Sequence, residues 1–190
     1  MSASNQYDTH LAQETVNLSN GQTVRVRPVC REDGALEKSL IEGLSPESRR
    51  DRFIGGSGKA SEKLIELLTD NDHQHHEAFI AIDENSDPPQ AVGIAHYALD
   101  DDGHGCECAV VVSDEWQHHG LGKILLQHLI HSARDRGCDT MYSIESADNS
   151  KVKNFARTMG FVCKADPRDY TLLTYTLDLH SPGPGARAAA

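Results

Sequence analysis

The sequence predicts an α/β (α+β) domain with one mixed, mostly antiparallel sheet of six to seven strands and helices on both faces. Three observations predict this class. Stretches with strand periodicity alternate with amphipathic helical stretches along residues 23–179. Three strand-like stretches with short connections lie between residues 77 and 113, which is typical of an antiparallel meander. A strand, a helix and a strand follow one another between residues 106 and 146, which indicates one parallel crossover.

The first elements are a strand and three helices. "TVRVRPV" at 23–29 alternates apolar and polar residues, as a half-buried strand does. A helix is predicted over 32–43, where apolar residues recur at helical spacing. Ser45 is a favourable N-cap and Pro46 suits the first helical position, so "SPESRRDRF" forms a second, short helix. "SEKLIELLT" at 61–69 is predicted to form a third helix.

The remaining elements complete the sheet. Two predicted strands flank the turn-rich "ENSDPP", and a third is apolar along most of its length, which indicates a central strand. A helical stripe of apolar residues then extends to Gly137. In order, these elements are the strands "EAFIAID", "QAVGIAHYAL" and "CECAVVVS", the helix after "GLG", the strand "TMYSIES", the helix "NSKVKNFARTMGF", and a closing strand or hairpin at "LLTYTLDL".

Length and charge narrow the class of protein. The 190 residues suit one domain, so we expect an ordered region at 23–179 between flexible segments at 1–22 and 180–190. The net charge of −11 argues against a broad surface that binds the phosphates of a nucleic acid. No apolar run approaches the roughly 20 residues of a membrane span, and the N-terminus lacks a basic start and an apolar centre. We expect a cytoplasmic protein without nucleic-acid or membrane partners.

Neither the cysteines nor the histidines predict a metal site. The five cysteines contain no C-x-x-C pair, so neither a disulfide framework nor a zinc ribbon is indicated. Cys106 and Cys108 share one strand face, where small buried and unreactive thiols are common. The His-rich "HQHHE" at 73–77 lies in a polar stretch and is interpreted as solvated. We therefore expect no bound metal.

The stretch "QHHGLG" at 117–122 joins an apolar strand to an amphipathic helix. The first N–H groups of a helix have no intrahelical acceptor and favour an anion. Gly120 and Gly122 have no Cβ, so a phosphate can approach the backbone closely. A tight turn that packs helix on strand is the alternative interpretation. The spacing fits neither G-x-x-x-x-G-K-[ST] nor G-x-G-x-x-G, which argues against nucleotide triphosphatases and dinucleotide-binding folds.

The loop at 117–122 resembles the Q/R-x-x-G-x-G/A pyrophosphate loop of the GNAT superfamily of N-acetyltransferases, and Asn149 and the "MGF" ending at Phe161 follow at the expected distance. The resemblance covers about residues 23–179. "LSPESRRDRF", "CECAVVVSDEWQHHGLG" and "DNDHQHHEAFIAI" are similar to the GNAT domains of bacterial protein-lysine acetyltransferases, which modify metabolic enzymes such as acyl-CoA synthetases. The resemblance implies a GNAT fold, acetyl-CoA as acyl donor and an amine acceptor, in particular a protein lysine.

Two features depart from the family pattern. His118 and His119 stand where the loop usually has Gly and Arg or Lys, so less fixed positive charge meets the phosphates. Donor affinity is then expected to be weaker or to depend on pH through the imidazoles. Ala156 stands where many GNAT enzymes have a tyrosine that protonates the leaving thiolate. A thiol with a pKa near 8.5 leaves tolerably without such an acid.

Acetyl transfer to lysine needs a base, because freeing the amine of an ammonium with a pKa near 10.4 costs roughly 4.6 kcal/mol at pH 7. Glu107 lies between Cys106 and Cys108 in the strand before the loop, where burial would raise the pKa of its carboxyl. In the resembling enzymes, the glutamate at this position is the general base. A solvent-facing glutamate without a role in catalysis is the alternative, and Glu145 is the next candidate base.

The resemblance also implies how the donor is bound. The pantetheine arm lies along the central strand as an added strand, bonded to main-chain groups, and one backbone N–H stabilises the oxyanion. The residues predicted to bind acetyl-CoA are Val110, Val111, Val112, Gln117, His118, His119, Gly120, Leu121, Gly122, Lys123 and Asn149.

Two functions remain beside a protein-lysine acetyltransferase. A small-molecule amine acetyltransferase would share the donor loop and differ in its acceptor pocket at residues 32–70. A non-catalytic acyl-CoA sensor is favoured by the missing tyrosine. A homodimer is compatible with the sequence, which does not identify the acceptor.

Overall fold

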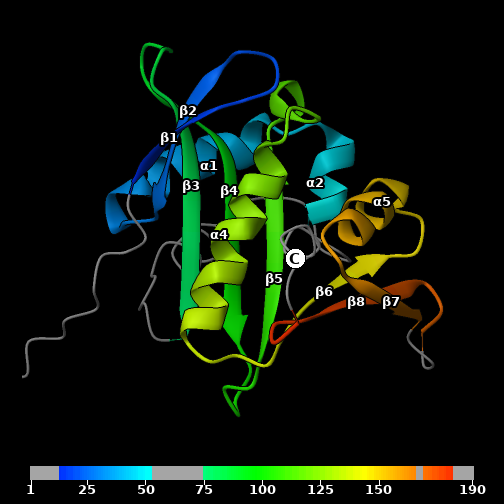
Figure 1. Cartoon of the computed structure of the whole chain (residues 1–190). Helices are drawn as coiled ribbons and strands as arrows, with labels where there is room; N and C mark the ends of the chain where they lie inside the picture. Colours follow the sequence, from blue (N-terminus) through cyan, green and yellow to red (C-terminus); the bar gives the residue numbers. More distant parts are fainter. Residues whose placement is uncertain (1–12, 53–74, 166–168, 182–190) are drawn as a thin grey trace, which may run out of the picture.

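Eight strands form one mixed sheet in the computed structural model, which describes residues 13–52, 75–165 and 169–181. Across the sheet the order is β1-β2-β3-β4-β5-β6-β8-β7 (Figure 1). Neighbouring strands are antiparallel except β5 and β6, which are parallel and connected through α4. The predicted mixed sheet, meander and parallel crossover are therefore confirmed, and the sheet has eight strands rather than the six to seven predicted. The strands are β1 (Glu14–Asn17), β2 (Thr23–Pro28), β3 (His76–Asp83), β4 (Gln90–Leu99), β5 (Gly105–Val112), β6 (Thr140–Ser146), β7 (Val162–Ala165) and β8 (Leu172–Asp178).

The helices agree with the predicted periodic stretches. The helix expected over 32–43 begins as the 3-10 turn η1 (Arg31–Asp33), and the helix predicted at 61–69 lies outside the described residues. Within the described ranges, no helix is long and apolar enough to cross a membrane. The α-helices are α1 (Gly34–Gly43), α2 (Pro46–Arg52), α4 (Leu121–Asp135) and α5 (Ser150–Thr158).

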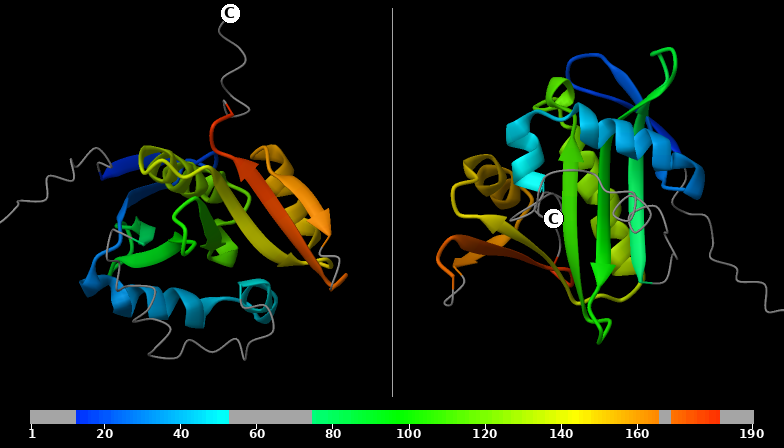
Figure 2. Two further views of the ribbon diagram at one scale, coloured as in Figure 1. Left: turned by 90° about the horizontal axis from the view of Figure 1, so that it is seen from below. Right: turned by 180° about the vertical axis from the view of Figure 1, so that it is seen from behind.

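The sheet separates two apolar clusters, because successive side chains of a strand point to opposite faces. Leu125 and Leu129 of α4 pack on one face, together with Cys106 and Cys108 of β5. Val111 of β5 belongs to a second cluster on the other face, with residues of α1. Figure 2 shows α4 on one side of the sheet and α1 and α2 on the other. Helices on both faces are therefore confirmed.

The first strand corrects the predicted domain boundary. β1 pairs with β2 inside the segment 1–22, which the polar, aperiodic sequence predicted to be flexible. Contacts distant in sequence hold it: Glu14 Oε1 lies 2.8 Å from His128 Nε2 on α4. In the following turn, the Ser19 N–H donates to the His119 carbonyl at 3.3 Å. A four-residue edge strand that depends on such contacts has too short a pattern to recognise locally.

Candidate active site

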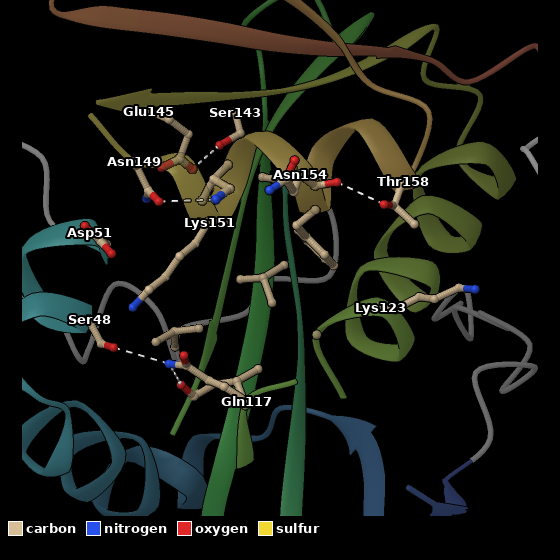
Figure 3. Close-up of a pocket in the computed structure, with 18 of the residues that line it drawn as sticks. Ser48, Asp51, Gln117, Lys123, Ser143, Glu145, Asn149, Lys151, Asn154 and Thr158 are labelled. Atoms are coloured by element: carbon tan, nitrogen blue, oxygen red, sulfur yellow. Dashed lines mark hydrogen bonds between the residues drawn. The ribbon is translucent and has the colours of Figure 1, made fainter. Parts of the chain in front are cut away.

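A cleft of about 1000 Å³ opens where β5 and β6 diverge. The two strands pair only from Gly105–Thr140 to Glu107–Tyr142, and β6 then continues beside β8. Beyond Glu107, β5 has no described partner strand on this side, so its backbone groups up to Val112 face the cleft. Residues of α2, of α5 and of the first turn of α4 form the other walls of the cleft (Figure 3).

Most of the predicted site residues meet in this cleft. The exceptions are His119 and Leu121, which do not line it. The lining residues are Ser48, Asp51, Glu107, Cys108, Ala109, Val110, Val111, Val112, Gln117, His118, Gly120, Gly122, Lys123, Ser143, Ile144, Glu145, Asn149, Ser150, Lys151, Val152, Asn154, Phe155 and Thr158.

The backbone at the start of α4 explains its glycine loop. Gly120 is the N-cap and has φ +93°, in the left-handed region that L side chains rarely adopt. His118 also has a positive φ, of 64°, at a position where the family usually has Gly. Gly122 lies within the helix, where an added Cβ would meet Val112 at 3.7 Å and Phe155 at 3.8 Å. The loop thus directs the first N–H groups of α4 toward the cleft while Gly122 leaves room above them.

Two residues of the predicted donor loop, His119 and Leu121, do not line the cleft. Leu121 is buried in the α4 cluster, because the first helical side chain turns toward the sheet. His119 is half-buried, and its carbonyl accepts from Ser19 of the β1–β2 turn. Of the two loop histidines, only the exposed His118 lines the cleft. His119, which is among the residues predicted to bind the donor, therefore lies outside the cleft lining.

Helix α5 and its N-cap Asn149 form one wall of the cleft, and of these residues only Asn149 was predicted from the sequence to bind the donor. Asn149 lines the cleft and caps α5, since its Oδ1 accepts from the Val152 N–H at 3.2 Å. Further along the helix, the residues three, four and seven positions after Lys151 also line the cleft. This spacing was a readable signal for one helix face. The residues on that face are Lys151, Asn154, Phe155 and Thr158.

Lys151 also connects the two helical walls of the cleft. Its Nζ lies 2.8 Å from Glu47 Oε1 on α2. The hydrogen bond to Glu47 raises the pKa of Lys151, and the same contact lowers the pKa of Glu47. Both side chains are largely exposed, so the pair adds little to stability. It does place a cationic side chain between α5 and α2 at the cleft.

Glu107 occupies the point of divergence, but not in the environment predicted for it. Alternation along β5 places it on the face opposite Cys106 and Cys108, where its side chain is exposed. The predicted burial of its carboxylate is therefore wrong. Glu107 pairs with Tyr142 of β6, and the Tyr142 hydroxyl donates to Asp100 at 2.7 Å. Burial and then this bond to Asp100 raise the pKa of Tyr142.

Glu145 faces the same cleft from β6. The Ser143 hydroxyl donates to Glu145 Oε1 at 2.6 Å, and both residues line the cleft (Figure 3). Register places Ser143 and Glu145 on the same face as Met141, which packs in the α4 cluster. Glu107 and Glu145 thus belong to opposite faces of the sheet, with Glu107 on the face of α1 and α2.

The cysteines differ in exposure. Cys106, Cys108 and Cys138 are buried as expected for such thiols, whereas Cys30 and Cys163 are exposed. Burial, followed by the charges of Glu145 and Glu107, raises the pKa of Cys108 to about 12. The described residues contain no group of three or more His, Cys, Asp or Glu that could hold a metal ion.

A parallel strand pair that diverges beside a glycine-capped helix, with a carboxylate at the divergence, defines an N-acetyltransferase of the GNAT class. The chain belongs to the Acetyltransferase (GNAT) family, whose pattern it matches over residues 44–161. It is 38% identical over 163 residues to Acetyltransferase PA5475 of Pseudomonas aeruginosa, which covers 86% of this chain and 88% of that protein. The protein is accordingly an acyltransferase.

Solved structures agree on the fold. The GNAT domain of S. lividans PAT superposes with a TM-score of 0.78 at 24% identity, over 87% of this chain and 96% of that one. The yncA protein of Salmonella typhimurium, whose structure contains its cofactor acetyl-CoA, superposes with a TM-score of 0.66 at 17% identity, over 86% and 98%. The structures of the yncA protein and of RimL, a ribosomal L7/L12 alpha-N-protein acetyltransferase, contain acetyl-CoA and coenzyme A, respectively.

Proposed function

We propose that the protein transfers the acetyl group of acetyl-CoA to the side-chain amine of a protein lysine, with Glu107 as general base. The observation that carries this proposal is the position of Glu107. Its carboxylate is exposed on the α1 and α2 face, at the point where the β5–β6 cleft begins. A lysine on the surface of a large acceptor protein can reach an exposed carboxylate. A deeply enclosed carboxylate would instead favour a small free amine as acceptor.

The donor is proposed to enter from the opposite side. Its pyrophosphate binds the free N–H groups at the start of α4, around Gly120 and Gly122, and its pantetheine arm adds to the open edge of β5. Val110, Val112 and Asn149 line that path. This arrangement brings the thioester toward the divergence, where Glu107 faces the acceptor side.

The reaction then needs two proton losses from the acceptor nitrogen and one displacement. Glu107 accepts a proton from the lysine ammonium, directly or through water, and the neutral nitrogen attacks the acetyl carbonyl carbon. A backbone N–H of β5 donates to the oxyanion, and the C–S bond breaks as the carbonyl re-forms. The nitrogen loses its second proton to water or to the departed thiolate, which gives the amide. Ala156 is buried and does not line the cleft, so position 156 supplies no hydroxyl to protonate the leaving thiolate. With a pKa near 8.5, a thiol can depart as the anion.

Direct transfer is favoured over an acetylated cysteine intermediate. Cys108 is the cysteine among the cleft-lining residues, and a thiolate would be the required nucleophile. Burial raises the pKa of this thiol to about 12, so very little of it is ionised at pH 7. The acetyl group therefore passes to the acceptor amine in one step.

Replacing Cys108 with alanine is expected to leave acetyl transfer within about threefold of wild type, because the direct route does not use the thiol. Rates with a lysine-containing acceptor, together with intact-protein mass spectrometry of acid-quenched enzyme and acetyl-CoA, test this. An acetyl adduct on the wild-type protein that disappears with C108A, together with loss of turnover, would establish the two-step route instead.

The acceptor class is tested by offering proteins and small amines in parallel. We expect radiolabelled acetyl-CoA and a cell lysate to give acetyllysine in discrete proteins, located by peptide mass spectrometry, and no comparable turnover of a panel of free amines. The Glu107→Gln variant controls for non-enzymatic acetylation. Turnover of a free amine alone would identify a small-molecule acetyltransferase. Donor binding without turnover of any acceptor would identify a sensor.

A further inference from the structure

A hydrogen-bonded network joins the N-terminus of α2 to the loop before α4. Asp114, in the 3-10 turn η2 (Asp114–Trp116), accepts from the Ser45 backbone N–H at 2.9 Å and from the Ser45 hydroxyl at 2.8 Å. It also accepts from the Ser48 hydroxyl at 2.7 Å. Ser45 in turn caps α2, since its Oγ accepts from the Ser48 N–H at 3.2 Å. Asp114 thus holds the first turn of α2 by three donors.

The network continues into the donor loop through Gln117. Gln117 Nε2 donates to the Ser48 hydroxyl at 3.2 Å and to the Val112 carbonyl at 3.1 Å (Figure 3). A side-chain amide has two N–H donors, and both have acceptors here. The remaining amide atom is an oxygen, which accepts hydrogen bonds and repels a phosphate. The side chain of Gln117 is therefore not available as a phosphate ligand in this arrangement.

Each hydroxyl in the network has a defined direction. Burial pushes the pKa of Asp114 up, but the bonds from Ser45 and Ser48 outweigh it and hold this pKa below its ordinary value. The ionised carboxylate can only accept, so the Ser48 proton must point to Asp114. The Ser48 oxygen then keeps a lone pair for Gln117. Ser48 is buried at 8% exposure whereas Asp114 is exposed, so both hydrogen bonds of the Ser48 hydroxyl are part-buried.

We propose that Ser48 and Asp114 are positioning residues for the donor loop: through Gln117 they fix the N–H groups at the start of α4 for the pyrophosphate of acetyl-CoA. Gln117 acts in the same way, as a brace between β5, α2 and the loop. The inference rests on the proposed donor site at this loop. It also connects α2, on the acceptor side of the sheet, mechanically to the donor loop.

Two acyl donors separate positioning from general stability. Acetyl-CoA carries the pyrophosphate, whereas S-acetylpantetheine carries the same thioester arm without it. For Ser48→Ala we expect kcat/KM to fall about tenfold with acetyl-CoA, as for loss of one to two part-buried hydrogen bonds, and to stay unchanged with S-acetylpantetheine. Ser48→Thr keeps the hydroxyl and should restore the wild-type preference. Asp114→Asn, which loses the charge at the centre of the network, should show the same donor-specific loss.

Ser132→Ala is the matched control. It removes another buried serine hydroxyl, which lies on α4 and is hydrogen-bonded at 3.2 Å to Tyr97 of β4. Neither residue lines the cleft. It should lower the melting temperature without altering the ratio between the two donors. Equal loss with both donors in Ser48→Ala and Asp114→Asn, or no loss in either, would overturn the positioning role. A wild-type enzyme that does not prefer acetyl-CoA would instead refute the donor site at the loop, and the inference with it.

Discussion

Glu107→Gln is expected to lower acetyl transfer by roughly 10² to 10⁴ at pH 7 while acetyl-CoA still binds. Glutamine keeps the shape of the side chain but accepts no proton at this pH. The acceptor ammonium, with a pKa near 10.4, then stays almost entirely protonated and cannot attack. Steady-state rates with the identified acceptor measure the chemical step, and calorimetric titration with acetyl-CoA measures donor affinity separately.

The pH profile gives this variant a second readout. As the pH rises toward the pKa of the lysine ammonium, part of the lost rate should return, because the free amine then forms without a catalytic base. Glu115→Gln is the matched control, since it makes the same charge change at an exposed residue that does not line the cleft. Near wild-type turnover of Glu107→Gln at pH 7 would move the base elsewhere, first to Glu145. Loss of donor binding together with turnover would make Glu107 structural.

Gly122→Asp is expected to weaken acetyl-CoA binding by roughly 10² to 10³ while the fold persists. A carboxylate in the first turn of α4 would stand against the pyrophosphate, and two like charges about 4 Å apart repel by about 4 kcal/mol at an effective dielectric constant near 20. The helix itself tolerates the change, because Asp is favourable at a helix N-terminus and Gly is not. Calorimetry should show the lost affinity, and the melting temperature should be unchanged or higher.

Gly122→Ala tests whether the loss of affinity in Gly122→Asp comes from the added charge or from the added volume of the side chain. Its Cβ would sit 3.7 Å from Val112 and 3.8 Å from Phe155, which is ordinary contact, and the family pattern accepts Ala at this position. Gly120 is a poorer site for this test, since at φ +93° any side chain strains the backbone. Wild-type affinity in Gly122→Asp would show that the donor phosphates do not use the start of α4.

Local patterns predicted the parts of the site that depend on neighbouring residues. A strand, two glycines and an amphipathic helix are adjacent in sequence, so the loop at 117–122 could be located before any fold was known. Asn149 could be predicted as a cap in the same way, and the structure shows its bond to Val152. The lining face of α5 obeys a helical spacing and was also accessible from the sequence.

Long-range contacts were not predictable in this way. Ser45 and Asp114 are 69 positions apart, and nothing in either segment specifies that they meet. The exposure of Glu107 depends on which face of β5 the helices cover, while its apolar neighbours suggested burial. β1 has four residues and acquires its position from β2 and α4. Each of these features arises from tertiary packing rather than local propensity.

The interrupted pairing of β5 with β6 has a consequence for self-association. A free strand edge invites another chain to pair with it and is a common origin of aggregation. Here the open edge beyond Glu107 lies inside the molecule, in a cleft shared by residues of β6 and α5. An incoming polypeptide strand would have to place side chains above and below the sheet, where these walls stand. A slender, unbranched molecule can enter instead. The unpaired edge of β5 is therefore open to such a ligand but not to pairing with a strand from another copy of the protein.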